Sequence, residues 1–174
     1  MELGSQMGSD SQRKEKDVLQ ILKKYFCREY FCKEHSFEKI GGRHFEFDLY
    51  CQSKSDSQEF IIIDIKIVAL IHDYNIRNFV LTRNQYNILA TKSSKNKFYL
   101  CIDAASKLTR RAKQLLDTNT IGLIRVNDDS VKSIADPESV ERKLQKIITS
   151  LEKSKDFEEE KKLGKSITLI SSTN

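Results

Sequence analysis

The sequence predicts an α/β fold in which a mixed sheet is flanked by helices. Apolar residues recur at helical spacing before residue 30, alternate with period 2 between about residues 37 and 67, and then follow helix and strand patterns in turn. The predicted order is helix, three strands, helix, strand, helix, strand, helix. Strands early in this order pair antiparallel, whereas the later ones arrive by helical crossovers.

The composition is that of one soluble domain. The chain has 174 residues, of which 39% are hydrophobic and 32% are charged, a length that suits a single domain with a sizeable core. No apolar run approaches the ~20 residues that a bilayer-spanning helix needs, and the N-terminus has no signal-peptide pattern. We therefore predict no membrane partner.

The cysteines are predicted to be reduced, because they lie mostly in apolar segments and show no disulfide framework, and this predicts an intracellular location, in the cytoplasm or in the nucleus or nucleoid. They are Cys27, Cys32, Cys51 and Cys101. Together with His35 and His44, Cys27 and Cys32 offer four potential zinc ligands. Their spacing lacks the paired C-x2-C or H-x3-H rhythm of structural zinc sites, so the sequence argues against zinc.

The first predicted element is a helix over about residues 11–30. Residues 1–11 are predicted to be disordered, or in part a cloning scar ahead of Met7. The helix carries an apolar stripe made of Val18, Leu19, Ile21, Leu22, Tyr25 and Phe26. Glu15 lies three, four and seven residues before Val18, Leu19 and Leu22, so it shares the buried side of the helix. The helix dipole alone also favours an acid in this first turn.

A short strand over residues 37–40 follows, and the turn Gly41-Gly42-Arg43 ends it. The two glycines would let backbone approach backbone, or a phosphate, at the lip of a hairpin. Arg43 and His44 lie where they could reach a DNA phosphate. Either could equally be a solvated loop side chain.

The central feature is a pair of strand-like runs in residues 44–67 around a polar turn. Alternation places Phe45, Phe47 and Leu49 on one face of the first run, with Glu46 and Asp48 on the other. In the second run, Ile61, Ile63, Ile65 and Ile67 share one face, and Phe60, Ile62, Asp64 and Lys66 share the other. If the chain reverses about Asp56, paired residue numbers sum to about 112 and Asp48 falls opposite Asp64.

Two carboxylates side by side repel each other unless a cation or a shared proton lies between them. Asp48, Asp64 and the nearby Lys66 suit a Mg²⁺ site, because this ion usually takes one or two carboxylates together with waters and substrate phosphate oxygens. The alternative is a structural Asp–Lys ion pair buried in the sheet.

At these residues the sequence resembles the PD-(D/E)xK phosphodiesterase superfamily, which includes restriction endonucleases, archaeal Holliday-junction resolvases and repair nucleases. Asp48, fifteen intervening residues and then Asp64-Ile65-Lys66 at the end of a hydrophobic strand carry the resemblance, which covers roughly residues 12–127. The sequence departs from the common pattern in two ways: no proline precedes Asp48, and the second acid is aspartate where glutamate is commoner.

The resemblance implies a restriction endonuclease-like αβββαβ core and a Mg²⁺-dependent nuclease, with Mn²⁺ expected to substitute. It also implies that Asp48, Asp64 and the carbonyl of Ile65 hold the metal and that Glu15 completes the acidic cluster. Lys66 would position the attacking water or stabilise developing charge. The predicted catalytic residues are therefore Glu15, Asp48, Asp64 and Lys66.

The later elements add an extra strand and helix to this core. We predict a helix over residues 82–91 from the capping-box residues Thr82 and Gln85, a strand over 97–103, a helix over 106–117 and a strand over 121–126. A last helix begins near Asp136-Pro137. The nuclease-like domain is predicted to span residues 12–151, and residues 152–174 to form a charged helical extension and tail.

Charge is uneven along the chain and favours DNA as a partner. The net charge is +5, yet residues 91–113 hold seven basic residues against the single acid Asp103. The basic residues are Lys92, Lys95, Lys97, Lys107, Arg110, Arg111 and Lys113. The last four are predicted to bind phosphates from one helix, unless that helix face is merely solvated. A homodimer or an accessory domain would enlarge the modest positive surface.

The sequence thus predicts a metal-dependent endonuclease that hydrolyses DNA phosphodiester bonds, of restriction, junction-resolving or repair type. The alternative is a catalytically inactive nuclease-fold protein that binds nucleic acid or a protein partner. Convergence of Glu15, Asp48, Asp64 and Lys66 in a solvent-reachable cleft favours catalysis. Carboxylates sealed under side chains favour binding.

Overall fold

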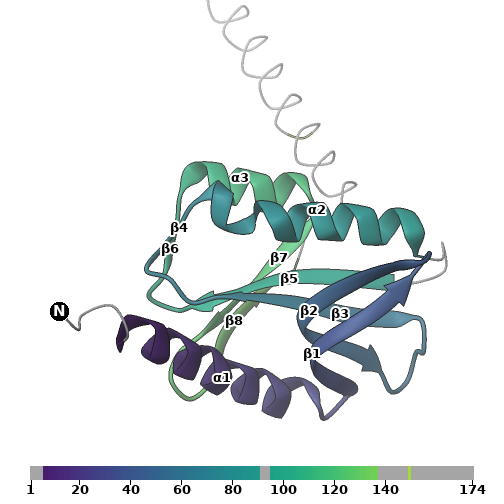
Figure 1. Ribbon diagram of the computed structural model, residues 1–174, viewed down its shortest axis with the longest axis horizontal. Coiled ribbons are helices and arrows are strands. Elements are labelled where there is room, and N and C mark those ends of the chain that lie inside the picture. The colour runs from purple at the N-terminus through teal and green to yellow at the C-terminus, as the bar shows by residue number, and fades with distance from the viewer. Residues whose placement is uncertain (1–5, 91–94, 137–148, 150–174) are drawn as a thin grey trace, which may run out of the picture. The chain divides into compact units, whose positions relative to one another are not determined.

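The computed structural model describes residues 6–90, 95–136 and Thr149, and Figure 1 shows the arrangement of their elements. The elements are α1 (Gln6–Phe26), β1 (Tyr30–Ile40), β2 (Arg43–Ser53), β3 (Glu59–Lys66), β4 (Leu70–Ile71), α2 (Asp73–Leu89), β5 (Lys95–Asp103), β6 (Lys107–Leu108), α3 (Arg110–Thr118), β7 (Ile121–Val126) and β8 (Val131–Ala135). The chain divides into two compact units, residues 1–137 and residues 138–174. The predicted last helix and charged tail lie outside the described residues, apart from Thr149.

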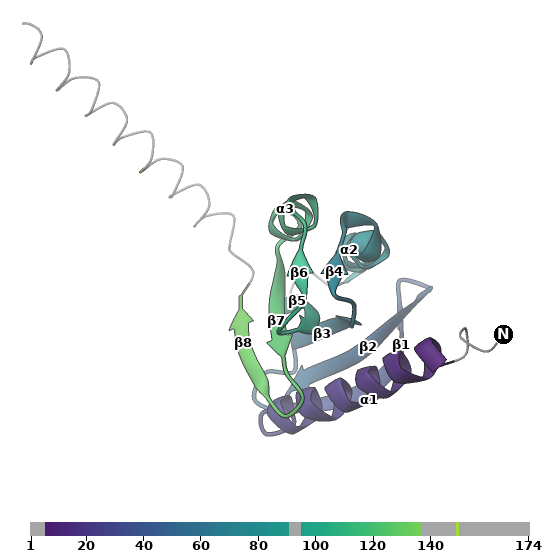
Figure 2. The ribbon, with the colours of Figure 1, turned by 90° about the vertical axis from the view of Figure 1, so that its left-hand side faces the viewer.

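The main sheet has six strands in the order β1-β2-β3-β5-β7-β8. β1, β2 and β3 pair antiparallel, β3, β5 and β7 pair parallel, and β8 returns antiparallel to β7. A second, two-stranded sheet joins β4 and β6. Helix α1 covers one face of the main sheet, and α2 and α3 lie side by side over the other (Figures 1 and 2). The predicted fold class is confirmed, because the elements follow the αβββαβ order and a further helix and strand come after it.

Each face of the sheet has its own hydrophobic core. Under α1, the core consists of Val18, Leu19, Leu22, Phe26, Leu49, Cys51, Ile61, Ile63, Ile65, Tyr99, Cys101, Ile124 and Val126. The core under α2 and α3 includes Phe45, Phe47, Tyr50, Ile62 and Tyr86. β3 is therefore buried on both faces, as its run of isoleucines predicted.

The predicted register between β2 and β3 is confirmed, but the predicted faces of β2 are partly wrong. The pairs from Leu49↔Ile63 to Gln52↔Phe60 each sum to 112. Phe45 and Phe47 lie in the core under α2 and α3, whereas Leu49 lies in the core under α1. The alternation of side chains therefore breaks at Asp48. In the β1–β2 pairing, Glu34 pairs with Leu49 and Ser36 with Phe47, but the intervening His35 and Asp48 are not paired. The φ of His35 is +43°, which is unusual for a strand.

The first helix is shorter at its C-terminal end than predicted, and the first strand is longer. α1 ends at Phe26 and β1 begins at Tyr30, whereas the helix was predicted to reach Tyr30 and the strand to start at residue 37. α1 also begins at Gln6, ahead of the predicted start near Ser11. β1 is an edge strand with only one partner, and its sequence carries a weak alternation that sequence reasoning missed.

Two later helices begin elsewhere than predicted. α2 begins at Asp73 and not at Thr82, because Ile76, Phe79, Val80 and Tyr86 form one continuous buried face. Asn75 Oδ1 accepts a hydrogen bond of 2.8 Å from the His72 backbone at its start. α3 begins at Arg110, where Thr109 is the N-cap and its Oγ1 accepts from Ala112 N at 3.2 Å. Lys107 therefore lies in β6 and not on the helix.

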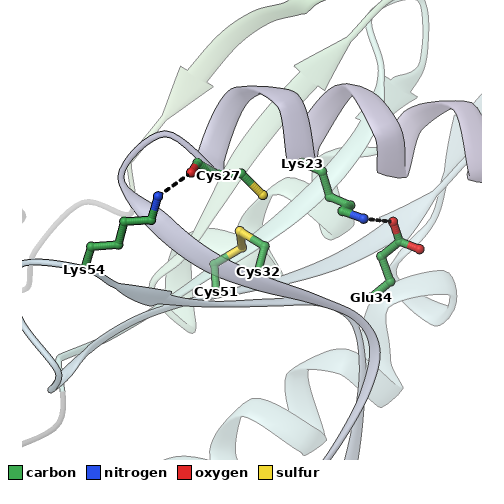
Figure 3. Close-up of a disulfide and its surroundings, with 6 residues drawn as sticks. All are labelled: Lys23, Cys27, Cys32, Glu34, Cys51 and Lys54. Carbon is green, nitrogen blue, oxygen red and sulfur yellow. Dashed lines mark hydrogen bonds and ion pairs between the residues drawn. A yellow bond between two sulfur atoms is a disulfide. The ribbon is translucent and has the colours of Figure 1, made fainter.

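The prediction of four reduced cysteines is wrong for two of them. Cys32 and Cys51 face each other in the β1–β2 register and form a disulfide (Figure 3). Cys27 and Cys101 are free thiols. The pairing was missed because β1 was predicted to begin after Cys32. The argument for an intracellular location from reduced cysteines is therefore removed.

None of the helices in the described part of the chain is long and apolar enough to cross a membrane.

Candidate active site

The predicted site lies where two strands of the main sheet separate. β2 pairs with β3 only through the four pairs from Leu49↔Ile63 to Gln52↔Phe60, whereas β3 stays paired with β5 as far as Lys66↔Ile102. Asp48 is the residue of β2 directly before this pairing, and Asp64, Ile65 and Lys66 are the residues of β3 directly after it. The structure therefore brings these four residues together at a fork in the sheet.

Asp48 fills a gap that the fork leaves in the backbone hydrogen bonding. Its Oδ2 accepts a hydrogen bond of 2.7 Å from Ile65 N. In a continued antiparallel ladder, a backbone carbonyl of β2 would have accepted from β3. The side chain thus satisfies a backbone donor that would otherwise be unpaired in a half-buried position. It also ties the Asp48 carboxylate to the residue between Asp64 and Lys66.

Asp64 is a carboxylate in an unfavourable environment. Its side chain is 20% exposed, and Oδ2 accepts no hydrogen bond from any described residue. The ammonium of Lys66 lies 2.7 Å from this oxygen, so the contact is an ion pair without hydrogen-bond geometry. Burial raises the pKa of Asp64 to about 6 even though Lys66 opposes the shift, and the charges of Asp48 and Glu15 raise it further.

Lys66 reaches back over the end of its own strand. Its side chain is 33% exposed, and Nζ also donates a hydrogen bond of 3.3 Å to the carbonyl of Ile65. The ammonium thus contacts two of the oxygens that the resemblance implies as metal ligands, Asp64 Oδ2 and Ile65 O. A buried carboxylate oxygen without a hydrogen bond, a backbone carbonyl and the Asp48 carboxylate together are a donor set of hard oxygens, which fits Mg²⁺.

Glu15 lies near this site but does not join a compact ligand cluster. It is half-buried on α1, one turn ahead of the buried residues Val18 and Leu19, as predicted. Its charge is close enough to act on the pKa of Asp64. Among the described residues, however, no group of three or more His, Cys, Asp or Glu side chains is arranged to hold one metal ion. The arrangement therefore consists of two strand carboxylates with a third at longer range.

A cavity of about 420 Å³ is lined by sequence neighbours of Glu15 and Lys66, but none of Glu15, Asp48, Asp64 and Lys66 lines it. It is lined by Lys14, Asp17, Val18, Ile21, Ile67, Asp103, Val126, Asn127 and Asp128. Lys14 and Asp17 flank Glu15 along α1, and Ile67 follows Lys66 directly. Asp103 ends β5 and Asn127 directly follows β7, so both lie at the carboxyl end of the parallel strands, where ligands bind in open α/β sheets. Asp103 also pairs with Lys14 at 3.4 Å.

Sequence reasoning missed these polar residues at the strand ends. The available signal was the first polar residue after an apolar strand, such as Asp103 after residues 98–102 and Asn127 after residues 121–126. It becomes informative only when the strands are known to be parallel, because their carboxyl ends then meet at one edge of the sheet.

The fold divides the predicted basic segment into two parts. Lys95 pairs with Asp56 at 2.8 Å and Lys97 with Glu59 at 2.9 Å, at the amino end of β5. These pairs neutralise much of the predicted local charge, and Lys92 lies outside the described residues. The local positive charge counted over residues 91–113 is therefore larger than the charge that these residues present unpaired, because the sequence did not reveal the acids that the neighbouring strand supplies.

The remaining basic residues lie at the other end of β5, the end that carries the site. They are Lys107, Arg110, Arg111 and Lys113, and all four are exposed. Arg111 is near enough to Asp73, the first residue of α2, to lower the pKa of that carboxyl, although Arg77 is the main cause. The helix starts and the end of β3 thus lie at the same edge of the sheet.

Arg43 and His44 do not join this group. Both are exposed next to the β1–β2 turn, where Gly41 and Gly42 have φ values of +56° and +80°. Gly41 lies against Leu89, the last residue of α2, so a methyl group there would meet its side chain at 2.8 Å. α2 has 17 residues and is therefore about 26 Å long. The turn is at the opposite end of α2 from Asp73.

The comparisons with known proteins add little to this description. No protein-family model matches the sequence, and no curated protein is similar to it at a significant level.

Among solved structures, the chain is similar to the protein of unknown function AF1548, with a TM-score of 0.45, 12% identity and coverage of 64% of this chain and 56% of that one. A repair endonuclease from Pyrococcus abyssi gives a TM-score of 0.42 at 15% identity over 67% and 47% of the two chains. EndoMS in its apo form gives 0.43 at 15% identity over 65% and 46%. The chain thus spans about half the length of these proteins, and likenesses this weak carry no argument about its activity.

Proposed function

We propose that this protein is a metal-dependent nuclease that hydrolyses phosphodiester bonds of DNA. The observation that carries the proposal is the fork between β2 and β3, where Asp48, Asp64 and Lys66 converge and Lys66 Nζ lies 2.7 Å from the buried Asp64 Oδ2. A buried carboxylate needs a compensating positive charge, because burial of an uncompensated charge destabilises the fold. A bound cation would supply that charge in place of the ammonium.

The proposed metal ligands are Asp48, Asp64 and the carbonyl of Ile65, with Glu15 acting at longer range. Bound Mg²⁺, or Mn²⁺ in its place, would supply a water of lowered pKa and neutralise charge on the phosphate during attack. The hydrogen bond from Ile65 N orients the Asp48 carboxylate before any ligand arrives. The raised pKa of Asp64 means that a proton competes with a cation for this carboxylate below about pH 6.

Lys66 would have two successive roles. In the metal-free protein its ammonium balances the charge of Asp64 at 2.7 Å. When a cation takes over that balance, the ammonium becomes free to hold a phosphate oxygen or the attacking water. Its flexible side chain is 33% exposed, which leaves room for this movement. Lys107, Arg110 and Arg111 are exposed at the same edge of the sheet, so they are the proposed contacts to DNA phosphates.

The test is cleavage of plasmid, linear, single-stranded and branched DNA with Mg²⁺ or Mn²⁺, compared with EDTA. Asp48→Asn and Asp64→Asn should each abolish cleavage. Products from the wild-type protein that are equally abundant in EDTA, or in both variants, would contradict the proposal. The panel also distinguishes restriction-like cutting from the resolution of branched substrates.

One observation favours the second candidate, a nuclease-fold protein that binds DNA without cutting it. Lys66 already neutralises Asp64, and no described group of three acids is arranged around one ion. This candidate predicts DNA binding that neither Mg²⁺ nor the loss of Asp64 alters.

A further inference from the structure

Three of the four cysteines lie together where α1 ends over the β1–β2 pair (Figure 3). Cys32 and Cys51 face each other across the two strands and form the disulfide. Cys51 belongs to the core under α1 and Cys32 packs against that core, so the disulfide is on the face of the sheet that α1 covers. Cys27 directly follows α1 and is a free, half-buried thiol. We call Cys27, Cys32 and Cys51 the three-cysteine cluster.

The contacts between α1 and β1 place Cys27 over Cys32. Lys23 Nζ pairs with Glu34 at 2.7 Å, and Gln20 donates a hydrogen bond of 3.2 Å to the same carboxylate. Cys27 N donates to Lys23 O at 2.8 Å, so Cys27 continues the helix about 6 Å beyond Lys23 on the same side. Cys32 lies two residues, roughly 6.6 Å, before Glu34 and on the same face of β1.

These two steps match in direction as well as in length. Only residues 27–29 separate α1 from β1, and the two elements run in opposite directions. A step forward along α1 from Lys23 therefore corresponds to a step back along β1 from Glu34. Figure 3 shows the resulting arrangement, in which the Cys27 side chain is directed toward the disulfide.

Two lysines hold the backbone and the charge around Cys27. Lys54, directly after β2, donates from its Nζ to Cys27 O at 2.8 Å, and its backbone N donates to Glu29 O at 2.9 Å. These bonds fix the α1–β1 turn against the strand that carries Cys51. The pKa of Lys23 is raised mainly by Glu34, and a negative charge on Cys27 adds a smaller part, so this ammonium is near enough to interact with a thiolate at Cys27.

We propose that the three-cysteine cluster is a site of intramolecular thiol–disulfide exchange, in which Cys27 attacks Cys32 and releases Cys51. The Cys27 thiol gives its proton to solvent, and the thiolate forms a bond to Cys32 Sγ. The bond between Cys32 and Cys51 breaks, and its electron pair leaves on Cys51 Sγ, which takes up a proton. One disulfide and one thiol are present before and after the step, so no oxidant or reductant is consumed.

The exchange moves a covalent link from one pair of elements to another. Before it, the disulfide joins the edge strand β1 to β2, the strand that also carries Asp48 three residues before Cys51. After it, the disulfide joins β1 to the end of α1, and β2 is free of any covalent link to the edge strand. The inference rests on the positions of the three sulfur atoms and does not depend on the proposed nuclease activity.

The test is disulfide mapping of the full chain, first held at about pH 4 and then brought to about pH 8 without added oxidant or reductant, because exchange requires the thiolate. Samples are quenched with acid, unfolded, alkylated with N-ethylmaleimide and digested with trypsin. The tryptic peptides 25–28, 29–33, 44–54 and 98–107 each contain one cysteine, so every linkage is identified by mass.

Within hours, the wild-type protein should contain linked peptides 25–28 and 29–33, with Cys51 alkylated, in at least about one molecule in a hundred. The rate should be the same between roughly 1 and 100 µM protein, because the step is intramolecular. Cys27→Ser should lower the alkylation of Cys51 at least tenfold. Cys101→Ser is the matched control and should leave the exchange unchanged, because Cys101 is buried in β5, beyond β3 from β2.

A second variant tests the same contact independently. Cys51→Ser leaves Cys27 and Cys32 as thiols, and in a glutathione redox buffer these two should form a disulfide. Thermal unfolding of each variant checks the fold, and this arm decides the question if Cys27→Ser fails to fold. The proposal would be overturned by a wild-type protein that keeps only the bond between Cys32 and Cys51, by an exchange rate proportional to protein concentration, or by a Cys51→Ser protein that forms only adducts with glutathione.

Discussion

The two ends of β3 use the same kinds of residues in opposite ways. At the amino end, Glu59 pairs with Lys97 at 2.9 Å and also accepts a hydrogen bond of 3.3 Å from the Tyr30 hydroxyl. At the carboxyl end, Asp64 pairs with Lys66 at 2.7 Å. The two carboxylates are equally buried, with 21% and 20% of their side chains exposed. Burial alone therefore does not distinguish them.

The difference lies in what surrounds each carboxylate. Glu59 Oε1 accepts hydrogen bonds from both partners, and its interaction with Lys97 raises the pKa of that lysine, as a favourable ion pair does. Asp64 Oδ2 contacts the single ammonium of Lys66 at 2.7 Å, and two further acids, Asp48 and Glu15, act on its pKa. One end of the strand thus stabilises the fold, whereas the other keeps a carboxylate in a form that a cation would stabilise.

The largest expected difference between the two ends is in catalysis. Asp64→Ala should reduce metal-dependent DNA cleavage by about a thousandfold or more, because it removes a proposed metal ligand. Glu59→Gln, at equal burial on the same strand, should leave the cleavage rate within about twofold. Gel assays with Mg²⁺ under single-turnover conditions measure both rates, with DNA binding as a check on the fold. Equal losses from the two substitutions would mean that the site assignment is wrong.

The second largest expected difference between the two ends of β3 is in how their carboxylates affect stability as the pH changes. The pKa of Asp64 is about 6 in the folded protein against 3.8 unfolded, so the folded state holds this proton more tightly. The contribution of Asp64 to stability is therefore greatest below about pH 4, falls as the pH rises through about 6, and is constant above that. At 1.36 kcal/mol per pKa unit, the loss is on the order of 3 kcal/mol at most.

Asp64→Asn should remove this loss. In EDTA, the free energy of unfolding of the variant should therefore exceed that of the wild type at pH 7, and the difference between the two should be smaller at pH 4. Urea unfolding at the two pH values measures the effect. Asp56→Asn is the matched control from the amino end. Lys95 lowers the pKa of Asp56, so losing this carboxylate should slightly destabilise the protein at pH 7. An Asp64→Asn protein that is less stable than the wild type at pH 7 would show that the ion pair with Lys66 outweighs burial.

The sequence predicted the carboxyl end of β3 better than the amino end. The turn around Asp56 and the period of the flanking runs were enough to place Asp48 next to the end of β3, because register follows from turn position and alternation. The separation of β2 from β3 was not predicted. It shows in the sequence only as the consecutive apolar residues Leu49-Tyr50-Cys51, which an unbroken alternation cannot accommodate.

The charges at the amino end could not be interpreted from the chain alone. Lys95 and Lys97 lie 39 and 38 residues from their partners Asp56 and Glu59, and only the parallel pairing of β3 with β5 brings them together. The local charge sum of residues 91–113 therefore overstated the basic surface. The Cys32–Cys51 disulfide was missed for a related reason, because it depends on the extent of an edge strand whose pattern is weak.

Substitution of Glu15 should reduce DNA cleavage less than substitution of Asp64, and the size of its effect tests whether Glu15 belongs to the site at the carboxyl end of β3. It acts on Asp64 from α1 but is not part of a compact ligand group. Glu15→Gln should therefore reduce cleavage by roughly tenfold, about 1.4 kcal/mol, and shift the Mg²⁺ dependence to higher concentration. The rate as a function of Mg²⁺ concentration measures it. Lys16→Gln, at the exposed next residue of α1, is the control. A loss as large as that of Asp64→Ala would make Glu15 a direct ligand.

The smallest expected effect is on DNA binding. It compares the unpaired basic residues near the carboxyl end of β5 with the ion-paired lysines at its amino end. Lys107, Arg110 and Arg111 are exposed at the carboxyl end of β5, whereas Lys95 and Lys97 at its amino end are paired with acids. Replacing the first three by Ala should weaken binding to all DNA sequences alike. Each lost phosphate contact releases about one fewer counterion, so the slope of log affinity against log salt should fall by about three.

The control is Lys95→Ala with Lys97→Ala, which should change the slope by less than about one, because ion-paired lysines contribute little further neutralisation of phosphate. Affinity is measured by fluorescence anisotropy between roughly 50 and 200 mM salt, with Ca²⁺ in place of Mg²⁺ to suppress cutting. Contacts to base edges would instead change sequence preference with little change in slope. Superimposable salt curves for the triple variant and the wild type would place the DNA away from this edge. A slope change confined to the Lys95 and Lys97 variant would move the binding surface to the amino end of the sheet.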